Sequence, residues 1–277
     1  MAFRNPMAPL RRLIDHSLTA VDVVPGPLYT VDPGMDVADA RKQLSEQNFD
    51  VAGVDGVGGE PIATYVSLER LRGATGGVVS DVAIAIPASR CIEKGLSLGR
   101  LVESLRDEES MFMLDGDRVG WLVTRADLRA PAFGAAILSY LVVIEEGLRI
   151  LVCRFTDGDW IEELTTERRN GVEERFDHLR KSNLEISRDL CANFSDWLHV
   201  ASKTVDTRQC LGYSSGSKWD RATAHFQQDR NDLAHGRTLF DGRSFEDGID
   251  RIAAIRDFAD VVWAKVDALD STETTES

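Results

Sequence analysis

An internal repeat in the first half of the chain restricts its possible folds more than any other feature. The hexapeptides Val-Ser-Leu-Glu-Arg-Leu at 66–71 and Val-Thr-Arg-Ala-Asp-Leu at 123–128 align with an offset of 57 residues. Each follows the same order of signals: a helical stretch, then two short strands separated by a turn rich in glycine or containing Asp-Gly. A duplicated β-α-β-β-α unit is therefore predicted for residues 15–131.

Local patterns within each unit indicate where its elements lie. In the first unit, apolar residues recur at helical spacing behind Asp36, a residue type that caps helices, so a helix is predicted over 36–47. In the second unit, a helix is predicted over 98–106, and two strands over 111–114 and 118–123 flank an Asp-Gly turn.

The repeated unit resembles the cystathionine-β-synthase (CBS) domain, which occurs in tandem pairs. The second unit carries the stronger signature, Gly-Trp-Leu-Val-Thr-Arg-Ala-Asp-Leu at 120–128. In that family the hydroxyl residue contacts a nucleotide phosphate, and the Asp three residues later contacts the ribose hydroxyls. The resemblance therefore implies that Thr124 and Asp127 bind a nucleotide, with an adenine nucleotide such as AMP or ATP as the regulator.

The first unit departs from this motif. Ser67 keeps the hydroxyl, but Arg70 replaces the Asp and Ala63 replaces the Gly, so no equivalent second site is expected. Arg70 is instead a candidate to contact a phosphate. A structural interpretation of both hexapeptides stays open, in which Ser67 and Thr124 are N-cap residues of short helices and the pair only dimerises or supports the fold.

From residue 132 onward, helical periodicity replaces the strand patterns. Helices are predicted over 132–153, 167–181, 186–203, 218–235 and 244–269. The last residues, 270–277, form a polar tail that is expected to be disordered, and 1–14 form a separate N-terminal segment. The predicted fold class is α+β, with a CBS pair followed by an all-helical bundle over 132–269.

The predicted fourth bundle helix ends in residues that are suited to phosphate chemistry. Arg230, Asn231 and His235 precede Gly236, a residue type that ends helices. Asn231 and His235 are four residues apart and share one face, away from the apolar stripe. An imidazole moves protons near neutral pH, and a guanidinium holds phosphate charge, so these residues suit RNA cleavage without a metal.

In the context of its bundle, this sequence resembles the Arg-x4-His motif of the HEPN (higher eukaryotes and prokaryotes nucleotide-binding) superfamily. Members are usually dimers in which two motifs form one metal-independent endoribonuclease site. The resemblance implies that Arg230 orients the scissile phosphate, His235 acts as acid or base, and Asn231 supports them. Glu145 and Arg149, spaced to pair on the first bundle helix, also resemble that superfamily, in which an acidic residue there positions the motif arginine.

The charge of the chain limits how it can contact nucleic acid. Its formal net charge of -14 opposes general affinity for phosphate backbones, so RNA contact requires a local cationic region. Between residues 203 and 243, Lys and Arg outnumber Asp, and we expect Arg237, Arg243 and Lys218 to contact the RNA backbone. The four cysteines lack metal-ligand spacing, so no metal site is expected.

The remaining sequence features bear on location and function. The N-terminus lacks the apolar region of a signal peptide, and the longest apolar run, 132–144, is too short to span a bilayer, so a cytoplasmic protein is expected. The predicted function is a dimeric endoribonuclease regulated by an adenine nucleotide, with phage defence, toxin control and RNA processing left open as pathways. The alternative is a non-enzymatic nucleotide sensor with an inactive helical module that dimerises or recruits a partner.

Overall fold

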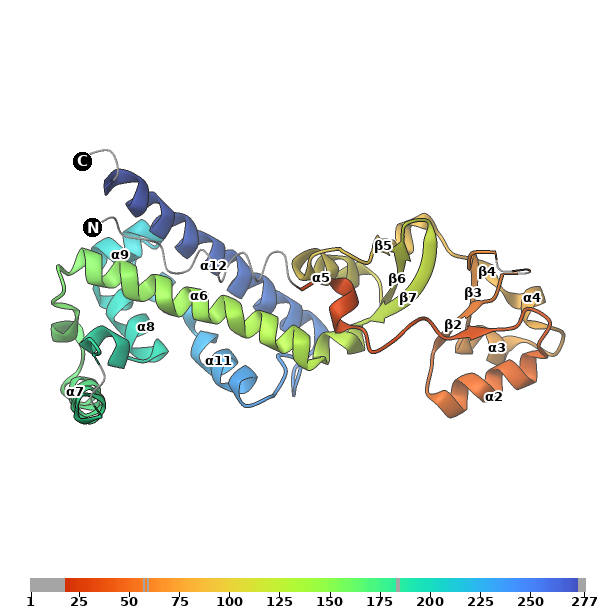
Figure 1. The fold of residues 1–277 in the computed structure, drawn as a ribbon, viewed down its shortest axis with the longest axis horizontal. Helices are drawn as coiled ribbons and strands as arrows, with labels where there is room; N and C mark the ends of the chain where they lie inside the picture. Colours follow the sequence, from red (N-terminus) through yellow and green to blue (C-terminus); the bar gives the residue numbers. More distant parts are fainter. Residues whose placement is uncertain (1–17, 57, 59, 183–184, 274–277) are drawn as a thin grey trace. The chain divides into compact units, whose positions relative to one another are not determined.

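The computed structural model describes residues 18–56, 58, 60–182 and 185–273. The chain divides into two compact units, Leu18–Phe133 and a second that begins at Gly134. The first contains both β-sheets, and the second is helical (Figure 1). This mixed composition confirms the α+β class. The predicted N-terminal segment and residues 274–277 of the predicted tail lie outside the described residues.

Each half of the first unit contributes its own small sheet. The first sheet has the order β1 (Thr30–Val31), β2 (Val51–Val54), β3 (Thr64–Ser67) and β4 (Ile84–Ala85). The second has the order β5 (Cys91–Glu93), β6 (Ser110–Asp115) and β7 (Arg118–Thr124). In both sheets the first pair of strands is parallel and the next is antiparallel, which is the order that the predicted repeat requires.

The two helices predicted for the first unit are present, and the first begins at its predicted cap. α2 (Val37–Gln47) starts behind Asp36, whose side chain accepts a hydrogen bond from the Ala38 N–H at 2.7 Å. α5 (Leu98–Asp107) occupies the predicted place in the second half. The shorter helices of this unit are η1 (Ala20–Val23), α3 (Leu68–Gly73), α4 (Val79–Val82), η3 (Ala88–Arg90) and η4 (Arg125–Arg129).

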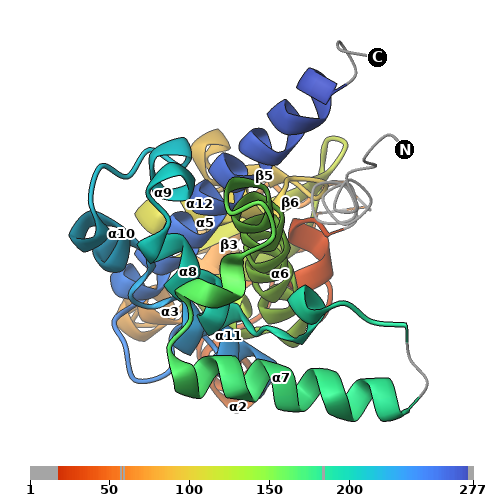
Figure 2. The ribbon, with the colours of Figure 1, turned by 90° about the vertical axis from the view of Figure 1, so that its left-hand side faces the viewer.

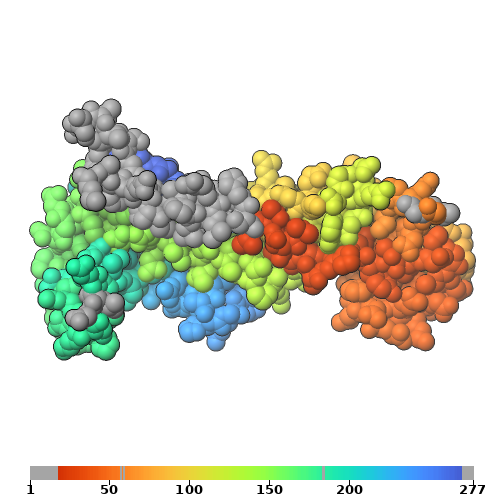
Figure 3. All heavy atoms as spheres, in the orientation of Figure 1, coloured from red at the N-terminus to blue at the C-terminus, as the bar shows by residue number. Residues whose placement is uncertain are grey.

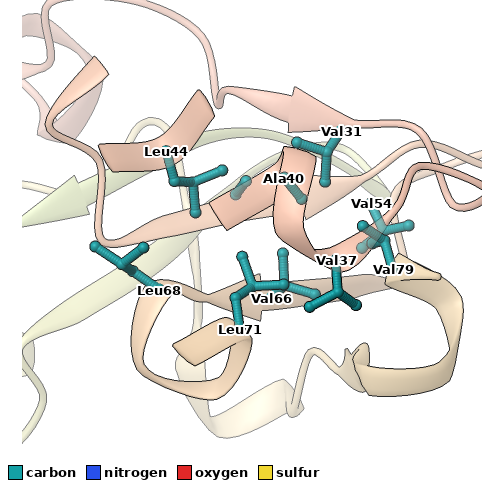
Figure 4. Close-up of a cluster of buried hydrophobic side chains, with 10 residues drawn as sticks. Val31, Val37, Ala40, Leu44, Val54, Val66, Leu68, Leu71 and Val79 are labelled. Carbon is teal, nitrogen blue, oxygen red and sulfur yellow. The ribbon is translucent and has the colours of Figure 1, made fainter. Parts of the chain in front are cut away.

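Backbone hydrogen bonds join η1 to the second half of the unit and join α2 to the segment that precedes α4. The Ala20 N–H donates to the Leu96 carbonyl at 2.8 Å, and the Val37 N–H donates to the Gly77 carbonyl at 3.0 Å. Within the first half, buried aliphatic side chains from the sheet, α2, α3 and α4 form one cluster (Figure 4). Because burial of this apolar surface requires both layers, the sheet and its helices stabilise each other.

The second unit is an assembly of helices around two long ones. These two are α6 (Pro131–Phe155) and α12 (Phe245–Glu273), which run side by side (Figures 1 and 2). Gly147 permits their close approach, since a Cβ there would lie 2.2 Å from Cγ1 of Val262. The other elements are η5 (Trp160–Glu163), α7 (Thr166–Lys181), η6 (Arg188–Cys191), α8 (Phe194–Lys203), α9 (Val205–Cys210), α10 (Gly216–Thr223) and α11 (Phe226–Ala234).

Three predicted helices of the bundle need correction. The helix predicted over 218–235 is interrupted by a turn at Ala224 and His225, which separates α10 from α11. Tertiary packing accompanies the break, because Trp219 of α10 and Phe226 of α11 both pack on Phe258 of α12, with ring centroids 5.7 and 5.1 Å away.

The helix predicted over 186–203 begins later than expected, at Phe194. Its start is set by a capping box, in which the Asn193 side chain accepts from the Asp196 N–H at 3.1 Å and the Asp196 carboxylate accepts from the Asn193 N–H at 3.0 Å. The last helix also extends further than predicted, since α12 continues to Glu273, so residues 270–273 of the predicted disordered tail are helical.

Candidate functional site

The Arg-x4-His sequence lies at the C-terminal end of α11. His235 is the C-cap residue, and Gly236 follows with a φ of 74°, a conformation that favours glycine. The Gly236 N–H donates to the Leu233 carbonyl at 3.1 Å, and the Arg237 N–H donates to the Asp232 carbonyl at 2.9 Å. These two bonds form a Schellman motif, which confirms the predicted helix end and holds His235 at the surface.

A surface hollow of about 540 Å³ adjoins this helix end. It is lined by Ala224, Gln227, Gln228, Asn231, Asp232, His235 and Arg237. Gln228, Asn231 and His235 follow one another at helical spacing and so form a stripe along α11. The helix and the loop after it lie at the surface, in light blue in Figure 3. The structure thus brings Asn231 and His235 together on an accessible face.

Arg230 has a different neighbourhood from the other two motif residues. It is half-buried and is not among the residues that line the hollow. Its positive charge acts on the half-buried Glu145 carboxyl of α6. Burial raises the pKa of Glu145, and the Arg230 charge opposes that increase. The motif arginine therefore has an acidic neighbour on the first long helix of its unit.

The predicted pairing of Glu145 with Arg149 is corrected by the structure. Arg149 forms its ion pairs with Glu146 and with Asp189 of η6. Successive helix residues point about 100° apart, so Glu145 and Glu146 have different neighbours. Glu146 lies on the side of Arg149 and η6, whereas Glu145 interacts with Arg230 of α11. Arg149 therefore joins α6 to η6 and does not orient Glu145.

The three cations that were predicted to contact RNA lie in three different environments. Arg237 borders the hollow, and its side chain is 71% exposed and 3.5 Å from the Asp232 carboxylate. Lys218 lies on α10, where its Nζ donates to the Ser214 Oγ at 3.1 Å. Arg237 is therefore the predicted RNA contact that the geometry favours.

Arg243 requires a correction. Its side chain is only 13% exposed, because it lies between two carboxylates of α11, 3.3 Å from Asp232 and 3.8 Å from Asp229. A guanidinium that is buried and paired in this way is not placed to meet an RNA backbone. Its contacts instead hold the loop after α11 against that helix.

The sequence pattern did not point to the buried ion pair beneath the site. Asp229 is 1% exposed and accepts a hydrogen bond from Arg251 of α12 at 2.7 Å. Burial raises the pKa of Asp229, and the Arg251 charge opposes that effect. The available signal was the position of Asp229 three residues after Phe226 and four before Leu233, on the apolar stripe of the helix.

The electrostatic effect of Arg230 on the pKa of Glu145 can be tested by NMR. Replacing Arg230 with Gln is expected to raise the pKa of the Glu145 carboxyl, because the positive charge that favours its ionised form is lost. A ¹³C titration of the Glu145 side chain measures the shift. Arg237→Gln is the matched control and is expected to leave that titration unchanged. An unaltered Glu145 pKa in Arg230→Gln would contradict the interaction.

The Thr124 and Asp127 motif of the second half forms a helix cap. The Thr124 N–H and Oγ1 both donate to the Asp127 Oδ2, at 2.7 and 2.9 Å. Thr19 and Asp22 make the same two bonds, at 2.6 and 2.9 Å. This is the geometry that the structural interpretation expected. Because both bonds end on Oδ2, the Oδ1 of Asp127 keeps its capacity to accept from a ribose hydroxyl.

The corresponding residues of the first half are also caps. The Ser67 Oγ accepts from the Arg70 N–H at 3.2 Å, at the start of α3. The Arg70 Nε donates to the Val82 carbonyl at 2.6 Å, at the end of α4. This bond ties the Arg70 side chain to the backbone through one of its donors and leaves its Nη groups for other contacts.

The described residues lack both a metal-binding cluster and a membrane-spanning helix. In this part of the chain, no group of three or more His, Cys, Asp or Glu side chains is arranged to hold a metal ion. Among the helices formed by the same residues, none is both long and apolar enough to cross a membrane.

Comparisons with known proteins give matches among solved structures. The sequence itself matches no protein-family profile and no curated protein. The chain is similar to the CBS-pair protein CBSX2 from Arabidopsis thaliana, at 21% identity over 40% of this chain and 90% of that chain, with a TM-score of 0.33. It is also similar to a CBS domain protein from Pyrobaculum aerophilum complexed with AMP, at 9% identity over 40% of this chain and 90% of that chain, with a TM-score of 0.35.

A third similar structure is a CBS domain pair in complex with 5-methylthioadenosine and S-adenosyl-L-methionine. It is 12% identical over 40% of this chain and 92% of that chain, with a TM-score of 0.35. All three are proteins with CBS domains.

Proposed function

We propose that this chain is a metal-independent endoribonuclease of the HEPN type, which acts as a homodimer and is regulated by an adenine nucleotide bound to a CBS pair. The observation that carries the proposal is the exposure of Asn231 and His235 side by side at the hollow beside the end of α11. An exposed imidazole next to an amide, with the Arg237 cation at the same hollow, is suited to a sugar-phosphate strand.

The proposed reaction is a transesterification within the RNA strand. One imidazole takes the proton from the 2′-hydroxyl, and the 2′-oxygen attacks the phosphorus. The bond from phosphorus to the 5′-oxygen breaks, and a second imidazole gives that oxygen a proton. The products are a 2′,3′-cyclic phosphate and a 5′-hydroxyl. In a homodimer, His235 of each copy supplies one of the two imidazoles.

Arg230 supplies positive charge from the half-buried side of α11. In this role it stabilises the charge that develops on the phosphate, while Glu145 keeps the guanidinium in one orientation. Glu145 acts on the phosphate only through Arg230, so in this proposal it is a positioning residue.

The regulatory part of the proposal uses the Thr124 and Asp127 motif. Asp127 Oδ1 would accept from the ribose, and Thr124 would meet the phosphate. Along the chain this motif is followed directly by α6, the helix that carries Glu145. Nucleotide occupancy is thus proposed to change how the helical modules of two copies face each other.

Incubation of the full-length protein with RNA in EDTA tests this function. We expect cleavage to products that end in 2′,3′-cyclic phosphate, with a rate that changes when AMP or ATP is added. Intact RNA under all of these conditions would contradict the nuclease proposal and favour a second candidate.

That candidate is a nucleotide sensor with an inactive helical module. The observation that favours it is that Arg230 does not line the hollow and has its charge partly offset by Glu145.

Nucleotide binding has its own test. AMP at about 100 times its Kd is expected to stabilise the wild-type protein by about 2.7 kcal/mol, seen as a thermal shift. Asp127→Ala is expected to abolish that shift, because it removes the proposed ribose contact. It also removes a cap, so Asp22→Ala, which removes the equivalent capping bonds to Thr19, is the matched control and is expected to keep the AMP shift. An AMP shift that survives in Asp127→Ala would refute the ribose assignment.

A further inference from the structure

The loop after α11, residues 236–243, borders the hollow and carries its exposed cation; we call this loop the lip. At its start, the Arg237 N–H donates to the Asp232 carbonyl at 2.9 Å. A turn follows, because the Thr238 N–H and Oγ1 both donate to the Asp241 carboxylate, at 2.9 and 2.8 Å. Hydrogen bonds therefore hold the backbone on both sides of the Arg237 Cα.

The middle of the lip is anchored in the core of the helical unit. Phe240 is 3% exposed, and its ring lies against Gly248 of α12, where a Cβ would come within 2.4 Å of the ring Cδ1. The neighbouring Leu239 is also buried. Because movement of the lip away from α11 would expose both apolar side chains to water, the lip is a fixed support for the residues that it carries.

An alternating series of charges leads from α12 to the edge of the hollow. Arg251 pairs with the buried Asp229, which lies 3.8 Å from Arg243. Arg243 donates to the Asp232 Oδ2 at 3.3 Å, and Arg237 donates to the Asp232 Oδ1 at 3.5 Å. The first four side chains are at most 15% exposed, whereas that of Arg237 is 71% exposed. The series therefore ends on a cation that borders the hollow.

The contacts of Asp232 suit it to hold Arg237 without repelling a phosphate strongly. Its negative charge is offset by Arg243, so it opposes an anion in the hollow less than a lone carboxylate would. A planar guanidinium has five donors, so Arg237 can keep its bond to Asp232 and meet a second acceptor at the same time. A side chain that is held in this way loses less conformational entropy when an oxyanion binds.

We propose that Asp232 is a positioning residue, which holds the Arg237 guanidinium as a preformed contact for a phosphate of the RNA strand at the hollow. This inference rests on the proposed function, because that function makes RNA the ligand. The contact is to the backbone of the strand, so it contributes affinity and no base preference.

Binding of an RNA strand that cannot be cleaved tests this role without relying on catalysis. The full-length protein is titrated against labelled 2′-O-methyl oligouridine at several salt concentrations, and fluorescence anisotropy gives the affinities. Arg237→Ala is expected to weaken binding about tenfold, as for the loss of one charge-assisted hydrogen bond. The slope of log affinity against log salt is expected to fall by about 0.7, the value for one phosphate of a single strand. Oligocytidine is expected to show the same two changes.

Asp232→Ala is expected to weaken binding about fivefold, as for the loss of one ordered side chain, and to have no further effect in Arg237→Ala. Loss of a negative charge alone would instead strengthen binding to an anionic strand. Asp206→Ala, at an exposed position of α9, is the matched control and is expected not to weaken binding.

Arg237→Lys tests the same role without a change to the buried charges. It keeps the positive charge but lacks the planar fork that meets a carboxylate and a phosphate together. About a fivefold loss of affinity with an unchanged salt slope is expected. If Asp232→Ala does not fold, as judged by urea unfolding, this variant decides the proposal alone.

The role of Asp232 would be overturned by unchanged or stronger binding in Asp232→Ala, by an equal loss with and without Arg237, or by wild-type affinity in Arg237→Lys. A wild-type protein that does not bind the strand would overturn it as well. Losses that depend on each other in a protein that does not cleave RNA would leave the role standing and reject the nuclease. Cleavage with independent losses would do the reverse.

Discussion

Alanine at position 235 is expected to lower the rate of RNA cleavage by a factor of about 100 to 10,000, the range that loss of a general acid or base produces. The expected cause is chemical, since His235 is exposed and the bonds that end α11 use the backbone of Gly236 and Arg237. The measurement is the initial rate on end-labelled RNA in EDTA. His178→Ala, at an exposed position of α7, is the matched control and is expected to cleave at the wild-type rate.

The same variant tests whether the site is shared between two copies. If one histidine from each subunit is needed, an excess of His235→Ala protein is expected to suppress the activity of added wild-type protein, because mixed dimers hold one imidazole. An activity that simply follows the amount of wild-type protein would show that each copy works alone. Full cleavage by His235→Ala would remove His235 from the mechanism altogether.

Removal of the Asp229 carboxylate is expected to have the largest effect on stability. Asp229→Ala should lower the free energy of unfolding by about 3 to 5 kcal/mol, because it leaves buried positive charge without its partner. The Arg251 and Arg243 side chains are only 14% and 13% exposed, and both face Asp229. Urea unfolding measures the change, with Asp177→Ala at an exposed position of α7 as the control, which is expected to stay within about 0.5 kcal/mol of the wild type.

A double variant at Asp229 and Arg251 separates the effect of the lost charge from the effect of lost packing. Replacing both Asp229 and Arg251 with apolar residues of similar size is expected to recover most of the loss, because neither charge is then buried without a partner. If Asp229→Ala costs less than about 1 kcal/mol, or if the double variant is as unstable as the single one, the ion pair does not hold α11 to α12 in the way described.

Several elements could be predicted because their signals are local. The start of α2 follows from Asp36, whose carboxylate reaches the next turn of the same helix. The end of α11 follows from Gly236, since its left-handed backbone conformation strains any residue with a Cβ. The spacing of Asn231 and His235 likewise placed them on one face. In each case the interacting groups lie within a few residues of each other.

The wrong expectations share a different cause. Arg149 was paired with Glu145 by spacing alone, but Asp189, distant in the sequence, determines which side of α6 attracts the guanidinium. Arg243 is predicted to contact RNA because it follows the Arg-x4-His motif in a segment where Lys and Arg outnumber Asp. Its burial depends on Asp229 and Asp232, which tertiary packing places around it.

The sequence by itself determined the repeat, the class of the fold, the helix that carries the Arg-x4-His residues and the face that Asn231 and His235 share. The helix and its shared face depend on periodicity and capping, which act over one or two turns, and the repeat shows itself as a match between two segments of the sequence. Only the tertiary structure decided that Glu145 interacts with Arg230 and not with Arg149, that Asp229 is buried with Arg251, and that Gln228 lies in the same hollow as His235. The free energy of a charged or polar group depends on its desolvation and on partners from other helices, and neither is encoded in local spacing.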